Sequence, residues 1–331
     1  MTQPVTFTWQ DGERTIRFGR GALADAPSLL GEDYVLLTTA RGRDAAPGVV
    51  AGAAHVLDVR PGFVDEISAE LLDELPASTG LLVALGGGRV IDTTKALAAA
   101  SGRHAAAIPT TLSAAEMTKV HRLPTGITGV SGVRPRVVIN DPSICASQPD
   151  AELASSAANS LAHAVEAPLT TLASPVPTQA ALEAVHLTAN AYRGDVDEPD
   201  RDALALAALL AGYSIDGAWY GLSHVVSQTL VRVGGADHGP ANAVVLPHTT
   251  AALRRRLPDR FRALDRAAGE PVEALAGRLA ARAHASRIRD LGVPEARLED
   301  CADAGAGRAE LQNTPPPADR DELLGIYRAA W

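Results

Sequence analysis

Short apolar runs separated by helix-like stretches constrain the fold of the N-terminal half of this chain more than any other feature. The runs lie at residues 35–37, 55–59, 81–85, 105–108 and 137–139. Segments of helical period, such as 63–75 and 90–100, separate them, and this alternation is typical of βαβ units and a parallel sheet. Strands covered on both faces are expected to be continuously apolar, as these runs are. An Asp-Gly pair at 11–12, between segments 5–8 and 14–18, predicts a β-hairpin before these units.

The second half of the chain has a different pattern, which predicts helices only. Strand signals stop after about Pro149, and the following segments are rich in Ala, Leu, Arg and Glu with helical periodicity. Helices are expected at residues 150–172, 176–193, 200–230, 241–255, 271–290 and 319–331. A chain of 331 residues corresponds to about two domains. We therefore expect an α/β domain over residues 1–148, an all-helical domain over residues 149–331, and a cleft between them.

Composition excludes several classes of protein. The formal net charge of −9 argues against a nucleic-acid-binding protein, because phosphate recognition requires a basic face. Two cysteines, Cys145 and Cys301, are too few for a disulfide framework or a cysteine-rich zinc site. No apolar run reaches the roughly 18 residues of a membrane span, and residues 1–14 lack a secretory pattern. We expect a cytoplasmic protein that has no membrane partner.

Three consecutive glycines mark a candidate phosphate site. Gly86, Gly87 and Gly88 follow an apolar run and precede a helical segment. Glycines permit positive φ and close backbone approach, and the free N–H groups of the next helix attract anions. The segment is neither G-x-G-x-x-G nor a Walker loop, and an ordinary tight connection would have the same pattern. Arg89 could add a cation for the phosphate or be a plain surface residue.

Hydroxyl side chains follow two other expected strands. Thr110 and Thr111 could bond phosphate or ribose at the carboxyl end of the sheet, or simply cap a helix. Thr39 ends an earlier strand without an acidic residue for a ribose 2′-hydroxyl, whereas Arg41 and Arg43 just beyond it could accept a 2′-phosphate. The choice between NAD and NADP therefore stays open, with NADP tolerated.

Lysine is rare in this chain and both copies fall near these segments. Only Lys95 and Lys119 are lysines among 30 basic residues. Lys95 lies one helical turn after Asp92 in the glycine-turn segment, and Lys119 lies close to the second candidate loop. A compact ammonium is not interchangeable with a guanidinium fork, so we expect Asp92, Lys95 and Lys119 to serve the cofactor site.

Histidines of the helical half form a candidate substrate or metal site. Asn159, His163 and Glu166 share one helix face, His224 precedes Gln228 by four residues, and His238 lies in an expected loop. Imidazoles from separate elements could bind iron or zinc with one position open. Each of them could equally be an ordinary hydrogen-bonded histidine.

Several segments together resemble the group III, iron-containing alcohol dehydrogenase family, most closely its maleylacetate reductase branch. The matching segments are Phe18-Gly-Arg-Gly-Ala-Leu23, Gly86-Gly-Gly-x-x-x-Asp92-x-x-Lys95, Ile108-Pro-Thr-Thr111, Ala115-Glu-Met-Thr118, Asn140-Asp-Pro142, Asn159-x-x-x-His163-x-x-Glu166, Gly221-Leu-x-His224, His238-Gly-x-x-x-Ala243-Val-Val-Leu-Pro-His248 and Leu291-Gly-Val-Pro294. The resemblance spans nearly the whole chain, including the spacing from His224 to His238.

The resemblance implies a dehydroquinate synthase-like fold, in which a Rossmann-like parallel-sheet domain precedes an all-helical domain. It implies NAD(H) or NADP(H) at the glycine turn, hydride transfer to a small-molecule substrate, and an ordinary homodimer. The metal ligands of the family map to Asn159, His163, His224 and His238, with asparagine in place of an aspartate. The loss of that negative charge disfavours a divalent metal, and without metal the three histidines would supply hydrogen bonds or protons.

A second departure concerns the candidate proton relay. The family usually has a histidine where this chain has Gln228, and an amide can orient a carbonyl or carboxylate but cannot act as an acid. We expect an NAD(P)H-dependent reductase of an unsaturated oxo-carboxylic acid or a related carbonyl compound, with catalytic His163, His224, His238 and Gln228. Two alternatives stay open: a non-redox lyase or cyclase on the same fold, and a protein that has lost oxidoreductase activity.

Overall fold

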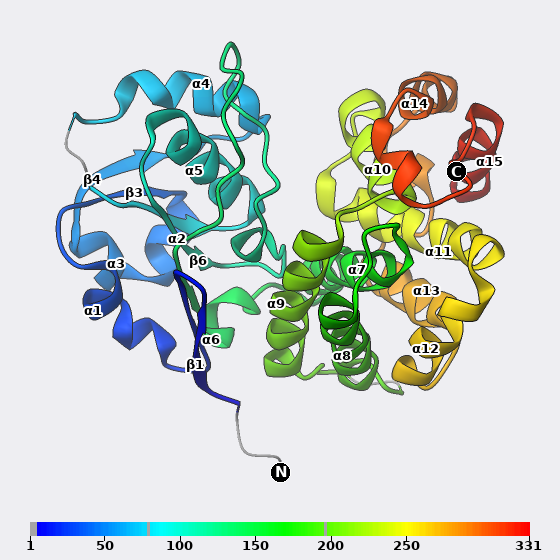
Figure 1. Ribbon diagram of the computed structural model, residues 1–331, viewed down its shortest axis with the longest axis horizontal. Helices are drawn as coiled ribbons and strands as arrows, with labels where there is room; N and C mark the ends of the chain where they lie inside the picture. The colour runs from blue at the N-terminus through cyan, green and yellow to red at the C-terminus, as the bar shows by residue number, and fades with distance from the viewer. Residues whose placement is uncertain (1–4, 78–79, 195–196) are drawn as a thin grey trace. The chain divides into compact units, whose positions relative to one another are not determined.

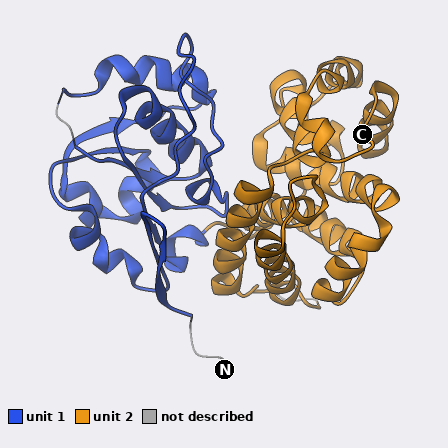
Figure 2. Cartoon of the chain, viewed as in Figure 1, with its two compact units in different colours: residues 1–147 blue, residues 148–331 orange. Residues whose placement is uncertain are grey.

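The computed structural model describes residues 5–77, 80–194 and 197–331. Residues 1–4, which belong to the segment inspected for a secretory pattern, lie outside the described residues. The chain divides into two compact units, residues 1–147 and residues 148–331, shown in different colours in Figure 2.

Unit 1 is built on a seven-stranded sheet in the order β1-β2-β7-β6-β5-β3-β4. The strands are β1 (Phe7–Asp11), β2 (Arg14–Phe18), β3 (Tyr34–Thr38), β4 (Ala53–Asp58), β5 (Leu82–Gly86), β6 (Ala105–Pro109) and β7 (Val137–Asn140). Only the β1–β2 pair is antiparallel, and the other neighbours run parallel. The predicted α/β class with a parallel sheet is confirmed.

The predicted hairpin forms, but its turn lies one residue later than expected. Asp11 pairs directly with Arg14, so Gly12 and Glu13 are the two turn residues. Gly12 has a φ of +61°, which glycine adopts without the steric cost that other residues incur. Asp11 therefore ends the first strand, and only Gly12 of the Asp-Gly pair lies in the turn.

Helices cover both faces of the sheet, as Figure 1 shows. The helices of unit 1 are α1 (Ala26–Leu30), α2 (Ala40–Ala45), α3 (Pro47–Ala51), α4 (Val64–Glu74), α5 (Gly88–Ser101) and α6 (Pro142–Cys145). Val35 and Leu37 of β3 pack with α4 and α5, whereas Leu36 between them packs with α1 and α3. Because alternate residues enter two different cores, the strand is apolar without interruption.

Unit 2 is helical throughout its described residues. Its helices are α7 (Asp150–Glu166), α8 (Pro175–Ala191), α9 (Arg201–Ala218), α10 (Leu222–Thr229), α11 (His238–Arg256), α12 (Pro258–Ala268), α13 (Val272–Arg282), α14 (Arg297–Ala306) and α15 (Arg320–Ala330). The sequence did not indicate α12 or α14. In α12 five of the eleven residues are charged, and only Phe261, Leu264 and Ala268 are buried. That stripe is too narrow to stand out in the sequence.

One predicted helix, 200–230, is wrong because it breaks into α9 and α10 (Figure 1). Trp219 has a φ of +57°, which ends α9, and Gly221 follows with a φ of −146° and a ψ of −123°, outside the helical region. A Cβ atom at Gly221 would lie 2.7 Å from Oγ1 of Thr314, so only glycine permits this close approach. The hydrophobic periodicity continues across the break, which explains why periodicity alone did not reveal it.

A search of the described helices finds none that is by itself both long and apolar enough to cross a membrane. The pair 201–218 and 222–234 passes the same test only when joined, across a bend of 106°.

Gly42 gives a test of the packing between α2 and the sheet. A Cβ atom there would collide with Oγ1 of Thr38 and lie 2.7 Å from the carbonyl oxygen of Leu85. We expect Gly42→Ala to lower the free energy of unfolding by about 1–3 kcal/mol, measured by chemical denaturation. Gly48→Ala in α3, where nothing lies within 4 Å of the added atom, is the control and should cause no loss. Equal stability of both variants would contradict this packing.

Candidate functional site

The glycine turn joins β5 to α5. Gly86 ends the strand, Gly87 precedes the helix and Gly88 is its first residue. No side chain caps the N-terminus of this 14-residue helix. The N–H groups of its first turn are therefore not taken by a capping side chain, which is the arrangement that binds phosphate groups.

The three glycines are required for close packing and not for unusual dihedral angles. None of the three has a positive φ, so the expectation that they use this freedom is wrong. A Cβ atom at Gly86 would lie 2.6 Å from the Val90 side chain, and one at Gly87 would lie 3.0 Å from that of Thr111. A side chain at either position would therefore collide with its neighbours. The fit of the turn to a pyrophosphate group rests instead on the uncapped helix start.

The threonines follow β6 and β3, the two strands that flank β5 in the sheet. Thr110 donates its backbone N–H to the carbonyl of Gly86 at 3.0 Å, and its side chain is buried. Thr39 caps α2, since its Oγ1 accepts a hydrogen bond of 3.2 Å from the N–H of Gly42. Arg43 forms an ion pair with Asp58 at the end of β4. One of the two arginines considered for a 2′-phosphate is therefore paired with an acidic side chain.

Lys95 is wholly buried, and its ammonium group holds the loop that follows β6. The group forms an ion pair of 2.8 Å with Asp92. Its other acceptors include three carbonyl oxygens at 2.8–3.1 Å, those of Ala115, Thr118 and Val120. Arg89 and Lys119, by contrast, are exposed. Lys95 therefore fixes the 115–120 loop next to the glycine turn.

Glu116 in this loop is a buried carboxyl group that the sequence did not single out. It accepts a hydrogen bond of 3.3 Å from Nδ2 of Asn140. Burial raises the pKa of Glu116 to about 7, although the charges of Lys95 and Arg14 oppose this shift. The Glu116 carboxyl therefore stays protonated up to near-neutral pH.

A buried Glu166–His224 pair is the centre of the helical unit's candidate site. Glu166 ends α7, and its carboxylate accepts hydrogen bonds from the N–H of Ser223 at 2.6 Å and from Nδ1 of His224 at 2.6 Å. Glu166 is completely buried, and His224 is 5% exposed. With Nδ1 bound to the carboxylate, Nε2 of His224 has no hydrogen-bond partner among the described residues. The pair thus orients a histidine whose second nitrogen is available.

His163 lies beside this pair. Its ring stacks on that of His224, with 4.7 Å between centroids and 10° between planes. Burial lowers the pKa of His163 well below its usual range, and the nearby His224 and His238 lower it further. His163 is therefore neutral at physiological pH and can serve as a hydrogen-bonding group.

The remaining members of the predicted ligand set are placed differently. Asn159 is buried one turn before His163 on α7. His238 is exposed and starts α11, where a loop was expected, and its backbone carbonyl accepts a 2.9 Å hydrogen bond from Asn242. A helix start at 238 replaces the predicted start at 241.

These side chains do not fit a metal ion as the structure arranges them. Two nitrogens of the predicted ligand set, Nδ1 of His163 and Nε2 of His224, are buried without a hydrogen-bond partner among the described residues, but a tetrahedral site needs four ligands. No three His, Cys, Asp or Glu side chains within residues 5–77, 80–194 and 197–331 are grouped to hold a metal. Asn159 also lacks the charge of a carboxylate ligand. We derive no chemistry through a metal here.

Gln228 is bound by an arginine that sequence inspection missed. Oε1 of Gln228 accepts a hydrogen bond of 3.1 Å from Nη2 of Arg308, which lies 80 residues away in the chain. Arg308 also pairs with Glu310 at 2.8 Å, and Glu310 accepts a 3.0 Å hydrogen bond from the hydroxyl of Tyr220. The Tyr220 ring lies 5.6 Å from that of His224. We call these residues, Tyr220, Gln228, Arg308 and Glu310, the arginine cluster.

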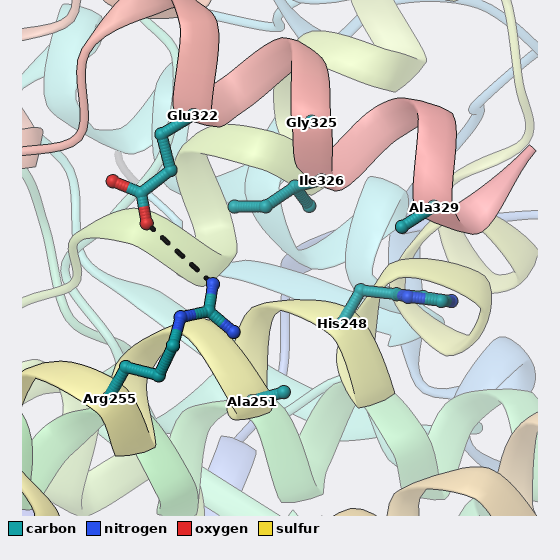
Figure 3. Close-up of a pocket in the computed structure, with 7 residues that line it drawn as sticks. All are labelled: His248, Ala251, Arg255, Glu322, Gly325, Ile326 and Ala329. Atoms are coloured by element: carbon teal, nitrogen blue, oxygen red, sulfur yellow. Dashed lines mark ion pairs between the residues drawn. The ribbon is translucent and has the colours of Figure 1, made fainter.

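A separate pocket lies between α11 and α15 (Figure 3). It has a volume of about 340 Å³, and His248 and the Arg255–Glu322 ion pair line it. His248 belongs to one of the motifs singled out in the sequence, and burial lowers its pKa. None of the candidate catalytic residues lines this pocket. The motif histidine therefore does not join the His163–His224 site.

Comparison with known proteins identifies the family. Residues 153–331 match the C-terminal model of the Fe-containing alcohol dehydrogenase family, and residues 43–149 match the iron-containing alcohol dehydrogenase model. The chain belongs to the iron-containing alcohol dehydrogenase family. It is therefore an oxidoreductase.

Relatives within this family include maleylacetate reductases. The chain is 29% identical to "Maleylacetate reductase" of Pseudomonas aeruginosa over 334 residues, which cover 95% of this chain and 94% of that protein. It is 31% identical to "Maleylacetate reductase 1" of Rhodococcus opacus, covering 76% of this chain and 72% of the relative. The predicted resemblance to this branch is confirmed.

Solved structures of the family share the fold. The crystal structure of 1,3-propanediol oxidoreductase has a TM-score of 0.84 and 25% identity, covering 99% of this chain and 100% of that one. Maleylacetate reductase from Rhizobium sp. strain MTP-10005 has a TM-score of 0.82 and 24% identity, covering 100% of this chain and 99% of that one. The predicted architecture of a sheet domain followed by a helical domain is that of the family.

The raised pKa of Glu116 predicts a pH-dependent stability. The native carboxyl binds its proton more tightly than the unfolded one, so its contribution falls as pH rises from about 4.5 to about 7. We expect wild type to lose up to about 3 kcal/mol from this group across that window. Glu116→Gln should remove this part of the slope, measured by urea unfolding from pH 4.5 to 8. An unchanged slope would contradict a buried, proton-binding Glu116.

Proposed function

We propose that this oxidoreductase uses NADH or NADPH to reduce an unsaturated oxo-carboxylic acid of the maleylacetate type, or a related carbonyl compound. The observation that carries the proposal is the buried Glu166–His224 pair with Nε2 of His224 available. The relationship to maleylacetate reductases over nearly the whole chain supports the substrate class. The known relatives reported above are oxidoreductases, so the lyase or cyclase alternative has no observation in its favour.

Residues 1–148 would bind the cofactor, and residues 149–331 would hold the substrate. The glycine turn at Gly86–Gly88 is the proposed pyrophosphate site, because no side chain caps the N-terminus of the helix that follows it. Thr39, Thr110, Thr111, Arg89 and Lys119 are the other proposed contacts. Asp92 and Lys95 act as positioning residues, since their ion pair anchors the 115–120 loop. The nicotinamide, when bound, supplies the hydride.

His224 is the proposed proton donor. A hydride that adds to a carbonyl carbon, or to a carbon conjugated with it, leaves negative charge on the carbonyl oxygen. Nε2 of His224 donates a proton to that oxygen, and Glu166 stabilises the imidazolium before transfer and keeps Nδ1 protonated afterwards. His163, held neutral by burial, donates or accepts a hydrogen bond beside it. His238 is a further candidate at the start of α11, and a homodimer is the proposed assembly.

Substitutions at the buried pair test the mechanism. We expect His224→Gln to lower kcat about 100-fold or more with maleylacetate and NADH, because the general acid is lost while cofactor binding is retained. Glu166→Gln should lower kcat about tenfold or more by weakening the orientation of the same ring. Cofactor oxidation is followed by absorbance and cofactor binding by fluorescence.

His186→Gln is the matched control for these variants, because His186 is exposed on α8 and belongs to neither candidate site. Its kcat should equal that of wild type. A wild-type protein that binds NADH or NADPH yet reduces no oxo acid would refute the proposed function and favour a member that has lost its redox activity.

Metal removal tests the donor geometry. Because the described residues hold no group of three His, Cys, Asp or Glu ligands and Asn159 is uncharged, we expect activity to be unchanged after dialysis against EDTA, and unchanged again after addition of Fe²⁺ or Zn²⁺. Metal content is measured by mass spectrometry on the same samples. Loss of activity on dialysis with recovery on metal addition would show that the histidines rearrange around an ion.

A further inference from the structure

We propose that Gln228 and Arg308 form a subsite for a substrate carboxylate, and that this subsite selects oxo acids over uncharged aldehydes and ketones. The proposal rests on the proposed function above, since it assigns residues that recognise the acid group of the same substrate. The resemblance assigns no role to Arg308, and the sequence indicates only that the Gln228 amide can orient a carbonyl or a carboxylate.

The Gln228 amide is held in one orientation. Its Oε1 accepts the 3.1 Å hydrogen bond from Nη2 of Arg308, and an arginine can only donate. This contact decides which end of the amide is oxygen and leaves the NH₂ group directed elsewhere. Gln228 is partly buried, so the NH₂ group is a fixed donor and not a mobile surface amide. An acceptor that meets this group gains a hydrogen bond at little cost in side-chain entropy.

The guanidinium of Arg308 is anchored along one edge only. The Glu310 carboxylate accepts hydrogen bonds from Nε at 3.0 Å and from Nη2 at 2.8 Å, so one edge of the guanidinium is bound to the protein. The Nη1 group has no acceptor within the described part of the chain, and the side chain is 23% exposed. A positive group with one edge anchored and one amino group unused is suited to a second carboxylate.

The position of the subsite relative to His224 defines the substrate. Gln228 follows His224 by one turn on α10, a rise of about 6 Å for four residues. A substrate oxygen at His224 and a carboxylate at Gln228 must therefore be separated by a few bonds, as in a short oxo acid. Tyr220 precedes His224 by four residues, and its hydroxyl donates a 3.0 Å hydrogen bond to Glu310. The arginine cluster thus connects substrate recognition to the proton donor.

Binding of succinate, a dicarboxylate without a carbonyl group, tests the subsite without any turnover. Titration calorimetry measures its dissociation constant for the NADH-bound protein. We expect Gln228→Met to weaken succinate binding about tenfold or more, because a hydrogen bond to a charged group is lost. Gln228→Glu should weaken it further, since a negative charge then faces the ligand. Arg308→Met should also weaken it.

A second ion pair on unit 2 gives the control. Arg278 also donates two hydrogen bonds to one carboxylate, that of Glu270, through Nη1 and Nη2, and its side chain is 40% exposed, so Arg278→Met removes a comparable ion pair on α13. This variant should bind succinate as wild type does. Circular dichroism shows whether each variant is folded. If Arg308→Met does not fold, succinate binding by Gln228→Met alone tests the subsite.

Kinetics separate this inference from the proposed function. With maleylacetate, Gln228→Met should raise KM about tenfold and leave kcat within about threefold, whereas loss of the proton donor lowers kcat. With an uncharged aldehyde of similar length, the variant should behave as wild type. If wild type binds succinate but reduces no oxo acid, the subsite stands and the reductase proposal fails. If wild type binds no succinate, or the variants bind it as Arg278→Met does, the subsite is refuted.

Discussion

The buried carboxylate of Glu166 is the interaction on which the helical unit's site depends. A completely buried charge is costly unless hydrogen bonds replace the lost water, and here they come from the start of α10 and from the His224 ring. One group thus joins the end of α7 to the start of α10 and also sets which nitrogen of the histidine carries a proton. Removing it would disturb the helix contact and the chemistry together.

Unit 1 uses the opposite charge in a similar way. The ammonium of Lys95 is enclosed by loop carbonyls and Asp92, so the loop beside the glycine turn has a fixed shape. In both units an ionised side chain at zero exposure organises backbone that must stay open for a ligand. A rigid support of this kind lets the ligand-facing groups keep their orientation before the ligand arrives.

Much of the fold followed from local pattern, because each parallel strand of unit 1 is a continuous apolar run bounded by helical segments. The break at Trp219 did not, because it combines a positive φ at Trp219 with a close approach of Gly221 to Thr314, and periodicity carries no information on either. For the site, the spacing of Asn159, His163 and Glu166 placed them correctly on one face. The pairing of Gln228 with Arg308 was invisible for the same reason as the break, since 80 residues separate the two partners.

Hydrogen bonds with Asn313, Thr314 and Tyr327 determine when α10 can reach its final position. Asn313 bonds the carbonyl of Tyr220 at 2.8 Å, Thr314 bonds the N–H of Leu222 at 3.2 Å, and the hydroxyl of Tyr327 bonds the carbonyl of Val226 at 2.9 Å. Asn313, Thr314 and Tyr327 are synthesised about 90 or more residues after the groups that they bind. The helix that carries His224 therefore cannot form these contacts until those residues have left the ribosome. A truncated chain that keeps every histidine of the site would still lack the frame that holds α10.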